Sequence, residues 1–139
     1  MADDVKDLMW LAGLLEGEGC FAFSRRHNGK YIYYILQLIM TDEDVVERAA
    51  SILGVKCTKQ ALITKGGKNI YRACAQGPYA LGWMIQLYPH MGKRRQAKID
   101  ECLTVWKLDG AKIHRTKLEK HHPGSITLKL LEGGGSPGR

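Results

Sequence analysis

Residues 10–21, which read WLAGLLEGEGCF, constrain the fold more than any other stretch of the chain. Apolar and small side chains fill two adjacent helical stripes, so we expect a helix over residues 4–18 that is buried around most of its circumference. Gly19 then ends it. Glu16 and Glu18 are unexpected at its C-terminal end, because the helix dipole there repels negative charge.

The first of these stripes consists of Trp10, Gly13, Leu14 and Gly17. Small residues four apart allow another backbone to approach closely, although packing within one chain would give the same pattern. A carboxylate beside the free carbonyls of a helix end is the ligand set that Mg²⁺ or Ca²⁺ prefers. Two helix ends brought together at this stripe would gather such ligands around a cation. Two solvent-exposed glutamates remain the alternative.

The remaining periodicities predict an α+β chain. Residues 20–26 and 30–40 alternate as strands around a turn centred on Asn28-Gly29. Thr41 is a good helix N-cap, and that helix ends at Gly54. A second hairpin follows over 55–63 and 70–76, and helices are expected over 78–87 and 94–108. We expect a core domain over residues 1–109 and, over 110–139, a basic extension that ends in a disordered Gly-rich tail. The extension either contacts the same partner as the core or is a solvated tail.

Composition and charge narrow the function. The net charge is +7, and residues 48–99 hold ten Lys or Arg and no Asp or Glu, which is typical of a protein that binds a polyanion such as nucleic acid. The four cysteines form no CxxC pair, so we expect free thiols in a reducing, intracellular compartment. No apolar run is long enough to span a bilayer, and no membrane partner is expected.

Strand alternation adds a candidate recognition surface. If Leu36 and Leu38 face the core, then Tyr31, Tyr33 and Gln37 face outwards, where an exposed row of such side chains is unusual unless it contacts a partner. Ser24, Arg26 and Asn28 should join this row from the preceding strand, and Lys59 and Arg72 from the second hairpin. Arg, Lys, Asn and Gln are the side chains that read bases or bind phosphates.

The segment LAGLLEGEG at residues 11–19 resembles the signature of the LAGLIDADG homing endonucleases, with glutamates in place of the family's aspartates. The order of helices and hairpins over residues 5–108 is similar too. The resemblance implies an α-β-β-α-β-β-α fold whose curved antiparallel sheet forms a DNA-binding saddle. Because the signature occurs once, it also implies a homodimer through the Trp10 stripe, acting on a pseudo-palindromic site.

The resemblance further implies roles for single residues. Glu18, with the Gly17 carbonyl, would bind metal, and Glu16 would support it. The stretch KRRQA places Lys93 as an active-site cation, with Arg94 nearby, and Asp42 takes the place of a residue that positions water. Some relatives have an arginine where this chain has Val46. The expected DNA-binding residues are Ser24, Arg25, Arg26, Asn28, Lys30, Tyr31, Tyr33, Gln37, Lys59, Lys65, Lys68, Arg72 and Arg94.

The function that this resemblance implies is a site-specific double-strand DNA endonuclease that hydrolyses phosphodiesters with Mg²⁺. Mn²⁺ would substitute, and Ca²⁺ would support binding without cleavage. The compartment would be a bacterial, archaeal or phage-infected cytoplasm, or an organelle. Two alternatives stay open: a LAGLIDADG protein of weakened activity that acts as an intron maturase or DNA-binding regulator, and an unrelated basic RNA-binding domain.

Overall fold

The computed structural model describes residues 4–61 and 67–109. The elements follow the order that the periodicities predicted, including both helices after the second hairpin, and contain the α-β-β-α-β-β-α order implied by the resemblance. They are α1 (Val5–Glu18), β1 (Gly19–Arg26), β2 (Tyr31–Met40), α2 (Glu43–Leu53), β3 (Cys57–Ala61), β4 (Asn69–Gln76), α3 (Gly77–Leu87), the 3-10 turn η1 (Tyr88–His90) and α4 (Lys93–Asp109). The α+β class is therefore confirmed. Lys65 and the extension over 110–139 lie outside the described residues, so the predictions made for them stay predictions.

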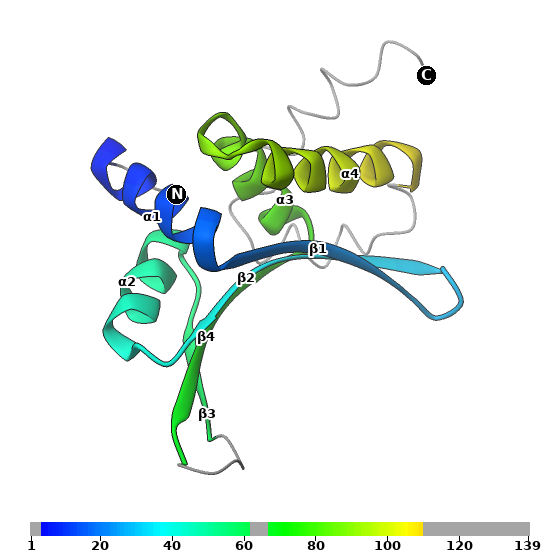
Figure 1. The fold of residues 1–139 in the computed structure, drawn as a ribbon. Helices are drawn as coiled ribbons and strands as arrows, with labels where there is room; N and C mark the ends of the chain where they lie inside the picture. Colours follow the sequence, from blue (N-terminus) through cyan, green and yellow to red (C-terminus); the bar gives the residue numbers. More distant parts are fainter. Residues whose placement is uncertain (1–3, 62–66, 110–139) are drawn as a thin grey trace.

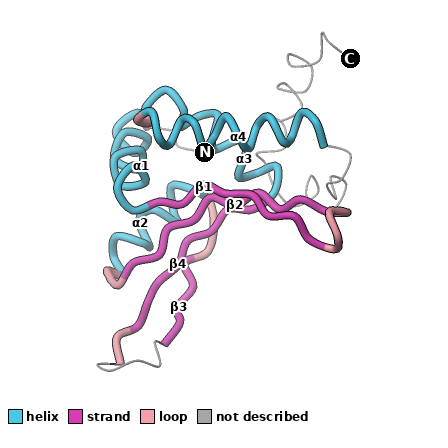
Figure 2. The backbone as a smooth tube through the Cα atoms, turned by 45° about the vertical axis from the view of Figure 1, so that its right-hand side comes forward, coloured by secondary structure: helices cyan, strands magenta, loops and turns pink. Residues whose placement is uncertain are grey.

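The strands form one antiparallel sheet in the order β1-β2-β4-β3. Figure 1 shows that the sheet is strongly curved and that the helices lie on its convex side. The turned view in Figure 2 shows the same arrangement, with α1, α3 and α4 above the strands. No described helix covers the concave face, which is therefore available to a partner.

The core lies between the sheet and these helices. From Ile32 to Leu38 every second side chain of β2 is buried, as the alternation predicted. The packed helix α3 contributes Trp83 and Met84, and α4 contributes Trp106. The other face of β2 is half-exposed, because nothing described packs against it.

Two turns are fixed by backbone conformations that few residues adopt. His27 and Asn28 have φ values of 56° and 58°, and Gly29 follows at 82°, so the predicted turn between β1 and β2 is confirmed. Gly54, at φ 72°, ends α2 in the left-handed region as expected. The prediction of Thr41 as N-cap is wrong by one residue. Asp42 takes that position, because its carbonyl accepts the first helical hydrogen bond, from Val46 N at 3.1 Å.

The expectation that α1 is buried around most of its circumference is also wrong for the single chain. Only Leu11, Ala12 and Leu15 are buried, because α1 packs against α2 and the sheet on one side alone (Figure 1). Gly13 is exposed, and a Cβ atom added there would meet nothing within 4 Å. Across residues 4–61 and 67–109, no helix is both long and apolar enough to cross a membrane.

Candidate active site and nucleic-acid interface

The two glutamates at the end of α1 have different surroundings. Glu18 is the last residue of the helix and is exposed, and its carboxylate makes no hydrogen bond or ion pair with any described residue. Gly17 carries one of the last carbonyls of α1, which lack a partner within the helix. The helix end therefore carries two oxygen donors on exposed residues, a carboxylate and a backbone carbonyl.

Glu16 instead ties α1 to α4. Its Oε1 accepts a hydrogen bond from Gly92 N, at the residue before α4 begins. Arg95 donates through Nε to the carbonyl oxygen of Glu16 at 3.2 Å and lies 3.9 Å from its Oε2. The carboxylate is thus repelled by the dipole of its own helix but attracted by the N-terminus of α4. This pairing explains why an acid stands at the C-terminal end of α1.

The other residues expected in catalysis are Lys93, the first residue of α4, and Asp42, which precedes α2. Lys93 is the first residue of α4 and is exposed, next to the Gly92 that holds Glu16. Asp42 is exposed at the N-cap of α2, and its side chain makes no capping hydrogen bond. The hydrogen bond from Gly92 to Glu16 therefore holds the start of α4, where Lys93 stands, against the end of α1. Asp42 takes no part in the contact between Glu16 and Gly92, because it lies after β2, at the N-cap of α2.

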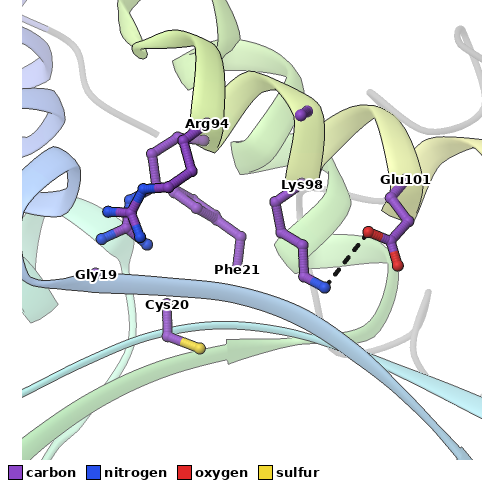
Figure 3. Close-up of a pocket in the computed structure, with 8 residues that line it drawn as sticks. Gly19, Cys20, Phe21, Arg94, Lys98 and Glu101 are labelled. Atoms are coloured by element: carbon purple, nitrogen blue, oxygen red, sulfur yellow. Dashed lines mark hydrogen bonds and ion pairs between the residues drawn. The ribbon is translucent and has the colours of Figure 1, made fainter.

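A basic groove of about 370 Å³ lies between β1 and the first half of α4. Figure 3 shows Arg94 and Lys98 reaching from α4 toward β1, with Phe21 on the near face of the strand. Lys98 Nζ lies 3.5 Å from Glu101 Oε2, whereas Arg94 is exposed and makes no ion pair or hydrogen bond with the described residues. The groove starts at Gly19, so an uncompensated cation lies beside the end of α1.

The concave face of the sheet carries the row that alternation predicted. Register pairs Ser24 with Tyr33 and Arg26 with Tyr31, which places all four on one face. Arg26 Cζ lies 4.9 Å from the centre of the Tyr33 ring, and Lys30 Nζ lies 5.5 Å from that of Tyr31. Cations held over aromatic rings form a flat, positively charged surface, suited to contact with bases and phosphates.

Gln37 and Arg72 continue the concave face toward its other end. Arg72 Nε donates to Gln37 Oε1 at 3.0 Å, and both residues line a hollow of about 530 Å³. Thr58 and Gln60 of β3 border the same hollow. Strand alternation identified Gln37 and Arg72 from the sequence. It missed the two β3 residues, because β3 has no buried position from which to count the alternation.

Not every expected DNA-binding residue has its side chain on the concave face. Arg25 pairs in register with buried Ile32 and lies 3.4 Å from Asp109 at the end of α4, on the helix side of the sheet. Lys59 pairs with Tyr71, one residue away from the pair formed by Thr58 and Arg72, so its side chain alternates to the other face, although the residue still borders the hollow beside Arg72. Lys68 is exposed just before β4. Lys65 lies outside the described residues.

The predicted dimer stripe of α1 is partly open in the single chain. Trp10 and Leu14 are half-buried and Gly17 is exposed. Arg48 of α2 covers the Trp10 ring, with Cζ 4.0 Å from its centre, and lies 3.8 Å from Asp7. Within residues 4–61 and 67–109, no group of three or more His, Cys, Asp or Glu side chains is placed to hold a metal ion.

Sequence reasoning missed Arg95, Lys98 and Cys74. Arg95 and Lys98 share a face of α4 with Arg94, and cation spacing on one helix would have indicated them. Cys74 lies on the concave face, where its Sγ accepts from Arg72 Nη2 at 3.3 Å. No sequence signal separates it from the buried Cys102, whose pKa burial raises to about 11.

Comparisons with known proteins agree with this architecture. Neither protein-family models nor curated proteins give a match. Among solved structures, two complexes of the homing endonuclease I-CvuI are similar, at 20% identity over 98% of this chain and 87% of theirs. One holds its own target in the presence of Ca (TM-score 0.55), and the other holds the I-CreI target, not cleaved, in the presence of Mg (TM-score 0.54).

The group I intron-encoded homing endonuclease I-CeuI, complexed with DNA, is similar at 16% identity and a TM-score of 0.53, over 85% of this chain and 63% of its own. These likenesses concern the path of the backbone, since the sequences have diverged widely. They agree with the element order and with the curved sheet described above. The chain therefore has the fold of the LAGLIDADG homing endonucleases, as residues 11–19 predicted.

Proposed function

We propose that this protein is a metal-dependent, site-specific DNA endonuclease that acts as a homodimer on a pseudo-palindromic target. The observation that carries the proposal is the difference in contacts between Glu16 and Glu18. Glu16 is engaged by Gly92 and Arg95, whereas Glu18 presents an uncompensated carboxylate at a helix end. A charge kept in that position without a protein partner is explained by a cation that joins it on binding.

The donors at this helix end fit a hard divalent cation. The Glu18 carboxylate and the Gly17 carbonyl are both oxygen ligands, which suit Mg²⁺ and Ca²⁺, and Mn²⁺ after them. One chain supplies one Glu18 carboxylate, and the α1 helix of a second copy would bring a second Glu18 carboxylate to the same place. When bound, Mg²⁺ would act as a Lewis acid that activates water and stabilises the leaving oxygen.

The chain's own cations would then act on the phosphate. Lys93 and Arg94 begin α4 beside the end of α1, and neither is neutralised by a described carboxylate. They would stabilise the negative charge that develops on the scissile phosphate. Asp42, with no capping bond, would be free to orient water. The concave face, with Arg26 and Arg72, would lie along the major groove of the DNA duplex.

The open stripe of α1 supports the homodimer. Gly13 and Gly17 have room on their outer side, and the half-buried Trp10 and Leu14 flank them. A second α1 laid against these glycines would bury the exposed part of the stripe and bring the two Glu18 carboxylates together. Double-strand cleavage follows from that symmetry, because each copy would act on one strand.

The test begins with the wild-type protein and a randomised duplex library. Cleaved sequences are selected in Mg²⁺, and bound sequences in Ca²⁺. Glu18→Gln keeps the side chain's shape, so it should bind the selected site with equal or higher affinity but cut it at least a hundredfold more slowly. Glu47→Gln, which removes an exposed carboxylate from α2, is the matched control and should cut normally.

Two outcomes would overturn the proposal. A Glu18→Gln protein that cuts the selected site at the wild-type rate would show that Glu18 holds no essential metal. A wild-type protein that binds a specific sequence in Ca²⁺ but never cuts it in Mg²⁺ or Mn²⁺ would favour the maturase or regulator alternative instead.

A further inference from the structure

On the concave face, several side chains are hydrogen-bonded to one another. Residues that each read a separate base would not require such bonds between them. Arg72 donates from Nε to Gln37 Oε1 at 3.0 Å and from Nη2 to Cys74 Sγ at 3.3 Å. Gln76 Nε2 in turn donates to the same sulfur at 3.7 Å. All these contacts lie within or between β2 and β4, where Gln37 and Cys74 are register partners.

These contacts use one specific edge of the arginine. A guanidinium has five N–H donors in a rigid plane: Nε and Nη2 share one edge, and Nη1 and Nη2 share the end. Gln37 and Cys74 occupy the Nε–Nη2 edge. The end, with its two parallel N–H groups, is left without a partner among the described residues. An edge of that geometry matches two neighbouring acceptors, such as O6 and N7 of guanine in the major groove.

The surroundings of Arg72 also favour a base over a phosphate. Arg72 is half-buried in the sheet, borders the hollow of about 530 Å³, and pairs in register with Ile39. Ile39, which is 42% exposed, offers an apolar neighbour on the same face. A phosphate contact needs only a flexible cation at the rim, as with Arg94. A guanidinium clamped in one plane loses little further freedom on meeting a base edge.

We infer that Arg72 reads a guanine in each half of the DNA target, and that Gln37 is a positioning residue that aims the arginine rather than a reader of its own base. This inference rests on the proposed DNA binding by the concave face, but not on cleavage. The positioning role of Gln37 follows from its Oε1, which accepts from Arg72 Nε and so fixes the plane of the guanidinium.

Register also places this guanine in the target. Gly19, which directly follows α1, pairs with Leu38, and the next residue, Ile39, pairs with Arg72. Arg26 lies at the far end of β1, beside the turn. If the two α1 helices meet at the symmetry axis, the guanine read by Arg72 lies nearer to that axis than any base contacted by Arg26.

The experiment measures binding preference in Ca²⁺ with the randomised duplex library, for wild type and four variants. Arg72→Leu should erase a guanine preference at one position per half-site, lowering affinity for the best site by about ten-fold to a hundred-fold per contact. Gln37→Leu should weaken preference at that same position, and Gln37→Glu, which keeps the acceptor, should retain it. Arg26→Leu is the matched control and should leave that position unchanged.

A second measurement identifies the atom. Replacing that guanine by 7-deazaguanine removes the N7 acceptor, so wild type should lose affinity on this site while Arg72→Leu should not. Thermal unfolding of each variant checks that it folds.

Several outcomes would overturn the inference. One is that Arg72→Leu weakens binding to all DNA sequences equally, which indicates a phosphate contact. Another is that Gln37→Leu alters the base preference at a different position of the target, which makes Gln37 a base reader. An unselective wild-type protein would overturn both the inference and the proposed site-specific function. Selective binding without cleavage would overturn only the nuclease.

Discussion

Replacing Glu16 or Glu18 by Gln tests whether the two acids at the end of α1 have separate tasks. Both changes remove one charge and keep the side chain's shape, at positions two residues apart at the end of α1. Glu16 lies against the N-terminus of α4, held by Gly92 and Arg95, while Glu18 has no described partner. We therefore expect Glu16→Gln to reduce stability and Glu18→Gln to leave it unchanged.

The expected loss follows from the contacts. A hydrogen bond to a charged acceptor contributes about 1 kcal/mol more than a neutral one, and a carboxylate at a helix N-terminus adds roughly 0.3–1 kcal/mol. The Glu16 side chain is 39% exposed, so screening reduces both contributions. Removing the charge also relieves repulsion at the end of α1. A net loss of about 1 kcal/mol remains, or roughly 3–4 °C in Tm for a domain of this size.

Glu18→Gln loses no contact and relieves the same repulsion, so its Tm should stay level or rise slightly. The assay is thermal unfolding followed by circular dichroism at one protein concentration and without divalent metal, because association and ligands both shift Tm. Cleavage of the selected site at 25 °C provides the second readout, where Glu16→Gln should retain most activity. A Glu18→Gln protein that melts lower than Glu16→Gln would refute the assignment.

Four further predictions concern the rest of the molecule. Gly13→Leu has room within the subunit, so it should fold but sediment as a monomer; an intact dimer would contradict the α1 interface. DNA affinity should fall steeply as salt rises, because bound phosphates release counterions, and a flat plot of log affinity against log salt would exclude that contact. Gly54→Ala should cost at least about 1 kcal/mol, measured by urea unfolding, since its φ is 72° and a Cβ would lie 2.7 Å from Tyr79 Oη. Burial raises the pKa of Cys102 from 9.0 to about 11, so its contribution to stability is complete below pH 9 and lost as pH rises to about 11; Tm should fall more in this range for wild type than for Cys102→Ala.

Sequence alone predicted the features that depend on neighbours along the chain. The turn at Asn28-Gly29 and the end of α2 at Gly54 follow from residues that tolerate positive φ. The inner and outer faces of β2 follow from alternation, because its buried positions are uniformly apolar. In each case the relevant interaction spans a few residues, so a local pattern is enough.

The errors arise where distant segments decide. Arg25 faces α4 because β1 aligns with β2 in a register that the sequence does not display. The face of Lys59 could not be counted from the sequence, because β3 is exposed at four of its five positions and shows no alternation; only its pairing with Tyr71 fixes it. Likewise, the partner of Glu16 stands 76 residues later in the chain, beyond any helical or strand period.

Strand β1 shows how one segment serves both scaffold and recognition. Arg25 turns toward the helices and pairs with Asp109, and its neighbour Arg26 turns to the concave face over Tyr33. The buried side chains of β2 lie on the helix side and form part of the core, whereas its concave-side residues lie outside the core. The core therefore does not depend on which side chains occupy the concave positions. It follows that a new DNA sequence could be selected by changing concave-face residues while the fold, the end of α1 and the start of α4 stay as they are.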